Sequence, residues 1–324
     1  MKKLLPLIFI FNLSNLVYSQ SQEKNSDYPQ TKIANNHVTM KLYLPDPDSG
    51  YYRATRFDWS GIIYSLRYKG HEYFGEWKKS HDPLVFEDIT GPAESYISPG
   101  LGYQQAKPGE GFIRIGIGVL EKPEEKGYTW NKTYSFIDQG KWTVNKGDDW
   151  IEFVHELDYE GYGYVYSKKI ELKKNEPGFK IIHQLKNTGS KIIETDQYNH
   201  NFFVIDGLKP GPSFSIKYPF AISTTDNLKG LMKMDNQTLF FKKSFIDTSL
   251  YFEIQGYSNE ITDHEITVLN HKTNASISFK CSKPIYKMSF WACETTLCPE
   301  NFVYISVLPG KKENWISDYT VFLN

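Results

Sequence analysis

Short runs of β-branched and aromatic residues, in which apolar and polar positions often alternate, follow one another along most of the chain. Clusters of Gly, Pro, Asn and Lys separate these runs, and no long segment shows clean helical periodicity. Alternation is typical of strands, and closely spaced turn signals are typical of all-β sandwiches and barrels. We therefore predict an all-β, antiparallel architecture built from runs such as VTMKLYL (38–44), FIRIGIGVL (112–120), WIEFVHEL (150–157) and FKIIHQLKN (179–187).

Two local features refine this pattern. The runs 150–158 and 162–173 are predicted to pair as a hairpin that turns at Tyr159-Glu160-Gly161. Between residues 76 and 111 the strand signal fades into a segment rich in Gly, Pro and acidic residues. A loop of that length in a compact domain is usually functional or an insertion.

The first 19 residues are predicted to be a cleavable secretory signal peptide. Two lysines precede an apolar run from Leu4 to Phe11, and the small residue Ser19 suits cleavage before Gln20. The run is far shorter than the ~20 residues that span a bilayer, so we expect a secreted or periplasmic protein with no membrane span. A polar N-terminal tail, 20–36, and a single β-sandwich domain, 37–324, are expected to follow, because no linker, charge block or repeat divides this region.

Composition narrows the possible ligands. The 324 residues carry 37 Lys and Arg against 38 Asp and Glu. This balance argues against nonspecific electrostatic binding of nucleic acid, which requires a basic surface. Aromatic residues make up 16% of the chain, which suits strands and also suits ligands with flat apolar faces, such as sugars.

Common catalytic and metal-binding signatures are missing from the sequence. It contains no G-x-S-x-G, H-E-x-x-H or P-loop motif, and no two histidines have metal-ligand spacing. The three cysteines, Cys281, Cys293 and Cys298, make a poor disulfide framework. Cys293 and Cys298 could bridge in an oxidising compartment, and buried free thiols are the alternative.

Two polar clusters interrupt apolar strand patterns and carry the candidate chemistry. His200 lies in the segment 196–203, and Glu294 follows the aromatic run that ends at Trp291. An imidazole and a carboxylate form a suitable acid–base pair near neutral pH.

These two segments resemble motifs of the aldose 1-epimerases, the galactose mutarotase family. Asn199-His-Asn-Phe-Phe203 is similar to the family's N-H-[ST]-[YF]-F-N-L stretch, and the segment 293–300 is similar to its L-E-T-Q-x-x-P-D stretch. The resemblance implies a large antiparallel supersandwich and an enzyme that interconverts the anomers of a sugar without a cofactor. It also implies that His200 is the general acid, that Glu294 is the general base and that Asn199 belongs to the substrate site.

The sequence also departs from the family. Neither the G-R-x-x-N-R motif nor the L-H-G-G segment is present. The resemblance therefore supports the acid–base pair better than it supports the family's sugar specificity. Arg56 is a candidate for binding sugar hydroxyls or a uronate carboxylate, and Trp291 or Trp59 for stacking on a sugar ring. The expected partner is a monosaccharide or oligosaccharide. A carbohydrate-binding β-sandwich without catalytic activity is the alternative function.

Overall fold

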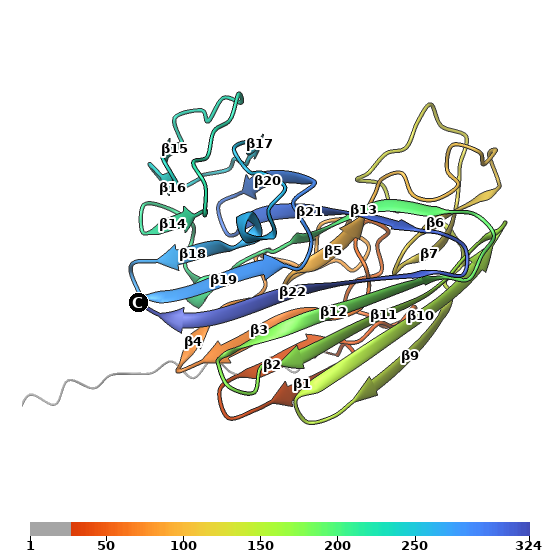
Figure 1. Ribbon diagram of the computed structural model, residues 1–324, viewed down its shortest axis with the longest axis horizontal. Helices are drawn as coiled ribbons and strands as arrows, with labels where there is room; N and C mark the ends of the chain where they lie inside the picture. Colours follow the sequence, from red (N-terminus) through yellow and green to blue (C-terminus); the bar gives the residue numbers. More distant parts are fainter. Residues whose placement is uncertain (1–26) are drawn as a thin grey trace, which may run out of the picture.

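The computed structural model describes residues 27–324, so the predicted signal peptide, 1–19, lies outside the described residues. Nearly all of the regular structure is antiparallel strand, arranged in one ten-stranded, one five-stranded, one four-stranded and one three-stranded sheet (Figure 1). The predicted all-β antiparallel sandwich is therefore confirmed. Two short 3-10 helices, η1 (Ile205–Gly207) and η2 (Ile261–His264), are present in the described part. No helix within residues 27–324 is long and apolar enough to cross a membrane.

The ten-stranded sheet forms the base of the molecule. Its strands alternate buried and more exposed residues over long stretches, as the periodicity predicts. The order across the sheet is β15 (Met232–Asp235), β16 (Thr238–Phe241), β14 (Phe214–Lys217), β18 (Ile266–Asn270), β19 (Ala275–Cys281), β22 (Lys312–Leu323), β12 (Gly178–Asn187), β11 (Tyr162–Leu172), β10 (Trp150–Tyr159) and β9 (Lys141–Lys146).

The predicted hairpin is confirmed as the pair β10 and β11. Tyr159 pairs with Tyr162, and both residues of the connecting turn, Glu160 and Gly161, have positive φ. A two-residue turn with both φ values positive matches the twist of the flanking strands, and glycine adopts that conformation without strain.

The five-stranded sheet packs on this base and positions the candidate site. Its order is β17 (Leu250–Glu253), β20 (Lys287–Ala292), β21 (Leu297–Val307), β13 (Ile193–His200) and β5 (Ala93–Tyr96). Strand β5 lies inside the segment 76–111, which the sequence pattern left without strands. All four residues of β5 are buried, so their pattern does not alternate and gives no strand signal.

Two smaller sheets complete the fold. The four-stranded sheet comprises β1 (Gln30–Ala34), β2 (Thr39–Tyr43), β3 (Ile62–Tyr68) and β4 (His71–Glu72), and the three-stranded sheet comprises β6 (Gly111–Arg114), β7 (Gly118–Glu121) and β8 (Phe136–Asp138). Strand β1 falls within the segment 20–36, for which we expected a polar tail. Ile33 is its only fully buried residue, so this edge strand has almost no hydrophobic pattern.

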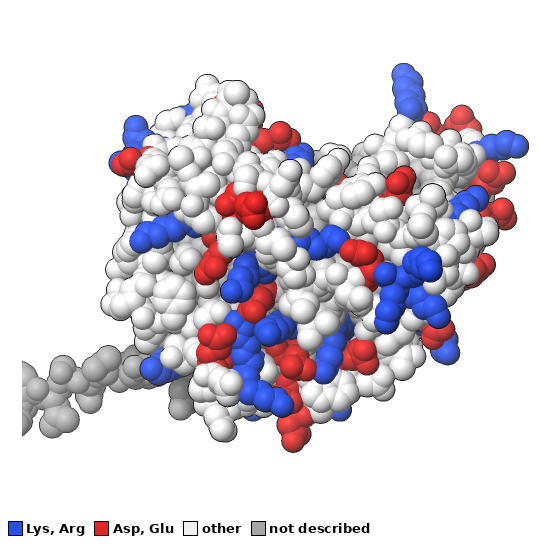
Figure 2. All heavy atoms as spheres, viewed as in Figure 1, with Lys and Arg blue, Asp and Glu red and all other residues white. Residues whose placement is uncertain are grey.

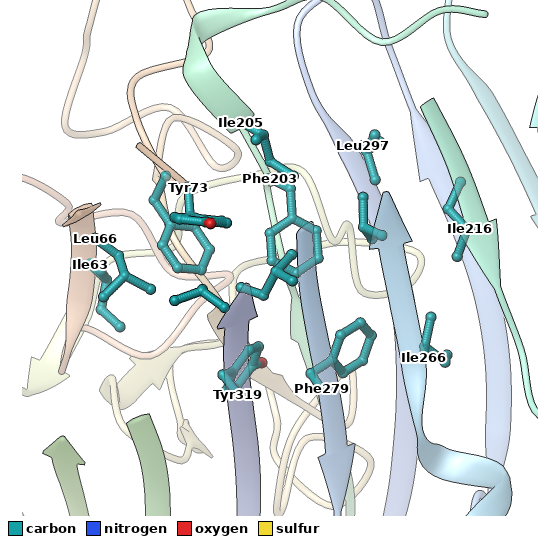
Figure 3. Packing of buried hydrophobic residues seen from close by; sticks show 14 of the residues in the cluster. Ile63, Leu66, Tyr73, Phe203, Ile205, Ile216, Ile266, Phe279, Leu297 and Tyr319 are labelled. Carbon is teal, nitrogen blue, oxygen red and sulfur yellow. The ribbon is translucent and has the colours of Figure 1, made fainter. Parts of the chain in front are cut away.

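The largest core lies where the sheets meet. Phe203 follows β13, Phe279 lies on β19 and Tyr319 lies on β22, and Figure 3 shows their side chains converging. Burial of such large apolar groups provides most of the driving force for folding. The three cysteines are free thiols. On the face seen in Figure 2, acidic and basic side chains are interspersed, in keeping with the balanced charge of the sequence.

Candidate functional site

An imidazole and a carboxylate lie opposite each other on neighbouring strands of the five-stranded sheet. Tyr198 of β13 pairs with Phe302 of β21, so continuing the antiparallel register by two residues brings His200 opposite Glu300. His200 Nε2 lies 2.9 Å from Glu300 Oε1, and each side chain is 5% exposed. Directly opposite residues on one face of an antiparallel pair are close enough for their side chains to interact.

The environment sets the protonation of this pair. Burial would raise the pKa of Glu300, but the contact with His200 and a hydrogen bond donated by Ser289 Oγ, at 2.8 Å, hold that pKa below its usual value. Burial lowers the pKa of His200, and the attraction of Glu300 offsets this only in part. Nδ1 of His200 has no hydrogen-bond partner in the described structure, which further disfavours a second ring proton. Near pH 7 the carboxylate is therefore ionised and the imidazole is mostly neutral.

The pair lies in the wall of a cavity of about 650 Å³. One face of the five-stranded sheet forms this wall, and the loops that carry Arg56, Glu87 and Trp130 line the rest of the cavity. Cavities of this size and mixed polar and aromatic character commonly bind small molecules. The sheet residues that line it are Ser95 and Tyr96 of β5, Asp196, Tyr198 and His200 of β13, Glu300 and Phe302 of β21, Lys287 and Trp291 of β20, and Tyr251 of β17.

Aromatic rings surround His200. Phe202 stacks on the imidazole with ring centroids 4.0 Å apart, and Trp291 meets it edge-on at 5.2 Å. Trp291 lines the cavity. Trp59, the alternative candidate, is buried in the core, and its indole Nε1 donates to the carbonyl of Ala54.

Arg56 reaches the cavity from a loop rather than a strand. Its guanidinium lies over the rings of Phe57 and Trp130, at 4.6 Å and 4.8 Å, and donates a 3.3 Å hydrogen bond to the hydroxyl of Tyr198. It forms no ion pair within the described residues. Its remaining donors are therefore available to a ligand.

Asn199 does not line this cavity. Alternate residues of a strand point to opposite faces, so Asn199 turns into the core while His200 turns outward. Its amide Nδ2 donates to Glu94 Oε1 at 3.0 Å, and its Oδ1 accepts from Gln197 at 3.0 Å.

Asn199 thereby contacts a buried charge cluster, which we define as Asp58, Glu94, Lys168 and His183. Lys168 Nζ lies 3.2 Å from Glu94 and 3.4 Å from Asp58, and His183 Nε2 lies 2.8 Å from Glu94. Burial would raise the pKa of Glu94, but His183 and Lys168 together lower it to about 2. The cluster joins the ten-stranded sheet to β5 behind the cavity.

The structure does not bring Glu294 to His200. Glu294 lies in the turn between β20 and β21, does not line the cavity, and forms an ion pair with Lys209. That lysine lowers the pKa of the Glu294 carboxyl. The carboxylate beside His200 belongs instead to Glu300, the last residue of the segment that resembles L-E-T-Q-x-x-P-D. Sequence reasoning missed Glu300 because the strand register, which selects between the two glutamates, is not visible in the sequence.

No group of three or more His, Cys, Asp or Glu side chains in residues 27–324 is arranged to hold a metal ion.

Comparisons with known proteins place the fold. No protein-family model matches the chain, and no curated protein sequence matches it. Among solved structures, the chain is similar to the Slr1438 protein from Synechocystis sp. PCC 6803, with a TM-score of 0.56, 12% identity, and coverage of 92% of this chain and 98% of the other. It is also similar to a galactose mutarotase related enzyme from Lactobacillus acidophilus, with a TM-score of 0.54, 12% identity and coverage of 90% and 97%.

A third similar structure is the GalM/aldose epimerase homologue from C. elegans, with a TM-score of 0.54, 11% identity and coverage of 91% and 99%. These similarities extend over nearly the whole of each chain. The chain therefore has the galactose mutarotase-like fold.

Proposed function

We propose that the protein is an aldose 1-epimerase-like enzyme that interconverts the anomers of a sugar outside the cytoplasm. His200 acts as the general acid and Glu300, in place of Glu294, as the general base. The observation that carries the proposal is the buried His200–Glu300 pair, 2.9 Å apart, in the wall of a cavity of about 650 Å³. The galactose mutarotase-like fold supports the same reaction class by analogy.

The reaction requires two proton transfers. Glu300 removes the proton from the anomeric hydroxyl O1 while protonated His200 delivers a proton to the ring oxygen O5. The C1–O5 bond breaks, C1=O1 forms, and the open-chain aldehyde rotates about the C1–C2 bond. O5 then attacks the other face of C1, His200 recovers its proton from O5, and Glu300 returns its proton to O1.

The side-by-side placement of the two groups fits this chemistry. O1 and O5 are bonded to the same carbon, C1, so an acid and a base on neighbouring strands can reach the anomeric hydroxyl and the ring oxygen of one sugar. In the free protein His200 and Glu300 contact each other directly. A bound sugar would place O1 and O5 between the two side chains, so that each group contacts one oxygen. The acid form is the protonated imidazole, whose fraction declines as pH rises through a pKa that burial holds below its usual 6.5.

Other residues of the cavity suit a sugar. Trp291 supplies aromatic surface for the apolar side of a pyranose, and the uncommitted guanidinium donors of Arg56 suit its hydroxyls. The hydroxyl of Tyr198, already bonded to Arg56, adds a further polar contact.

The test is anomer exchange by NMR across a panel of aldoses, with the wild type and His200→Ala. We expect the wild type to accelerate exchange for at least one sugar and the variant to lose about 10²–10⁴-fold of that rate. If the wild type matches the uncatalysed rate for every sugar, the enzyme proposal fails. Sugar binding measured by calorimetry without any acceleration would instead support the non-catalytic carbohydrate-binding alternative.

A further inference from the structure

The cavity extends along the sheet well beyond the acid–base pair. Asp196, Tyr198 and His200 alternate along β13 and all line it. Asp196 and His200 are four residues apart, which corresponds to about 13 Å along a strand. This distance exceeds the width of a single pyranose ring, so a sugar held at His200 does not reach Asp196.

The far end of the cavity has two charged side chains, one of which is without a partner among the described residues. The Asp196 carboxylate is only partly exposed, yet it makes no hydrogen bond or ion pair with any residue of the described range 27–324. Lys287 of β20 faces the same space, and its ammonium also pairs with Glu253 at 2.8 Å. Burial raises the pKa of Asp196, and the nearby charge of Lys287 opposes that rise.

An aromatic surface lies between these polar groups and the acid–base pair. Phe302 and Tyr198 stack with ring centroids 4.2 Å apart, and Lys287 lies 5.5 Å from the centre of the Phe302 ring. Aromatic rings beside hydrogen-bonding groups are the combination that suits the apolar faces and the hydroxyls of a sugar.

The same sheet face continues outward past Asp196. Tyr304 pairs with Asp196 in the β13–β21 register, and its ring lies 5.6 Å from that of Tyr286. Tyr304 and Tyr286 are 45% and 57% exposed. Exposed aromatic side chains therefore continue from the cavity to the protein surface, as a chain-like ligand requires.

We propose that Asp196, Lys287 and Phe302 form a second sugar subsite, and that the natural substrate is the reducing end of an oligosaccharide. The inference rests on the proposed function, because anomer exchange requires a free O1 and so places the reducing-end unit at His200 and Glu300. The next unit then lies on Phe302, with its hydroxyls bonded to Asp196 and Lys287. Because Lys287 also pairs with Glu253, the subsite has two carboxylates against one ammonium, and this excess of negative charge favours a neutral sugar over a uronate.

The test compares sugars of increasing length within matched series: glucose, cellobiose and cellotriose; glucose, maltose and maltotriose; xylose, xylobiose and xylotriose. For each sugar, anomer exchange gives kcat/KM and calorimetry gives Kd. In at least one series we expect the wild type to favour the disaccharide over the monosaccharide by about tenfold, as one added hydrogen bond to a charged group allows.

Asp196→Asn isolates the subsite, since it keeps the shape of the side chain and removes its charge. We expect it to abolish most of the disaccharide preference. Glu194→Gln is the matched control, because Glu194 lies two residues along the same strand, outside the cavity lining, where it accepts from the Tyr304 hydroxyl. It should leave the disaccharide preference as in the wild type. Thermal melting of both variants reports on folding.

The outcomes separate the two proposals. If exchange is accelerated but no series gains affinity or kcat/KM with length, the second subsite is overturned and the proposed function stands. If no sugar shows accelerated exchange, yet Kd improves with length and Asp196→Asn removes the gain, the proposed function fails and the subsite stands. Equal length preferences in Asp196→Asn and the wild type would also overturn the subsite.

Discussion

At the scale of single residues, His155 shows how burial fixes a protonation state. It is fully buried on β10, where its ring stacks on Trp142 with centroids 4.2 Å apart. Nε2 lies 2.9 Å from the carbonyl of Gln139, and Nδ1 lies 2.9 Å from the hydroxyl of Tyr164. A neutral ring satisfies both contacts by donating from Nε2 and accepting at Nδ1. Burial lowers the pKa of His155 to about 4.

This pKa predicts a loss of stability in mild acid. Between pH 6.5 and 4, His155 is protonated in the unfolded chain but remains neutral in the folded protein. The free energy of unfolding therefore falls as pH falls. The shift from 6.5 to about 4 corresponds to about 3 kcal/mol over that window. We expect His155→Gln to be less stable than the wild type at pH 7 but to lose less stability on acidification. Urea unfolding at pH 7, 5.5 and 4 measures both effects.

A second buried histidine contributes to the acid sensitivity of both the wild type and His155→Gln. His264 is also buried, with a pKa lowered to about 4, and it remains in both proteins. Acid should therefore destabilise the variant too, but by a smaller amount. Identical pH dependence in the variant and the wild type would contradict this account of His155.

At the scale of elements, strand alternation decides which residues serve the cavity and which serve the core. On β13, His200 faces the cavity while Asn199 bonds to buried Glu94. On β11, Lys168 points inward to the buried charge cluster, whereas Lys169 points outward and pairs with Glu171. Neighbours in sequence thus carry opposite roles because they lie on opposite faces of one strand.

The two lysines of β11 provide a matched test of the buried charge cluster. Lys168→Met leaves the carboxylates of Asp58 and Glu94 without their shared cation, and breaking a buried ion pair in this way typically costs about 3–5 kcal/mol. Lys169→Met removes a partly exposed pair and should cost at most about 1 kcal/mol. Urea denaturation at pH 7 compares the two variants. Equal losses would mean that the cluster does not hold the two sheets together.

At the scale of the whole molecule, the sequence predicted the class of fold better than its details. The long alternating strands of the ten-stranded sheet have clear signals because one face is buried and the other is not. Strand β5 lacked that signal because it is buried on both faces, and β1 lacked it because it buries little. The order of the strands in the sheets depends on long-range pairing, which a local pattern does not contain.

The candidate site divides in the same way. The sequence singled out His200, Arg56 and Trp291, and all three line the cavity. The resemblance to L-E-T-Q-x-x-P-D pointed to Glu294, and only the pairing of β13 with β21 shows that Glu300, in the same segment, faces His200. Asn199 was included through the same resemblance to the family's N-H motif, although the strand turns its side chain into the core.

The most direct measurement of the central claim compares the two glutamates. Anomer exchange is followed by NMR for Glu300→Gln and Glu294→Gln, each beside the wild type and with the best substrate of the sugar panel. Loss of the general base should lower the rate of Glu300→Gln by about 10²-fold or more. Glu294→Gln should exchange at the wild-type rate, because Glu294 lies outside the cavity lining and pairs with Lys209. A variant pair in which Glu294→Gln is inactive and Glu300→Gln is active would contradict the account.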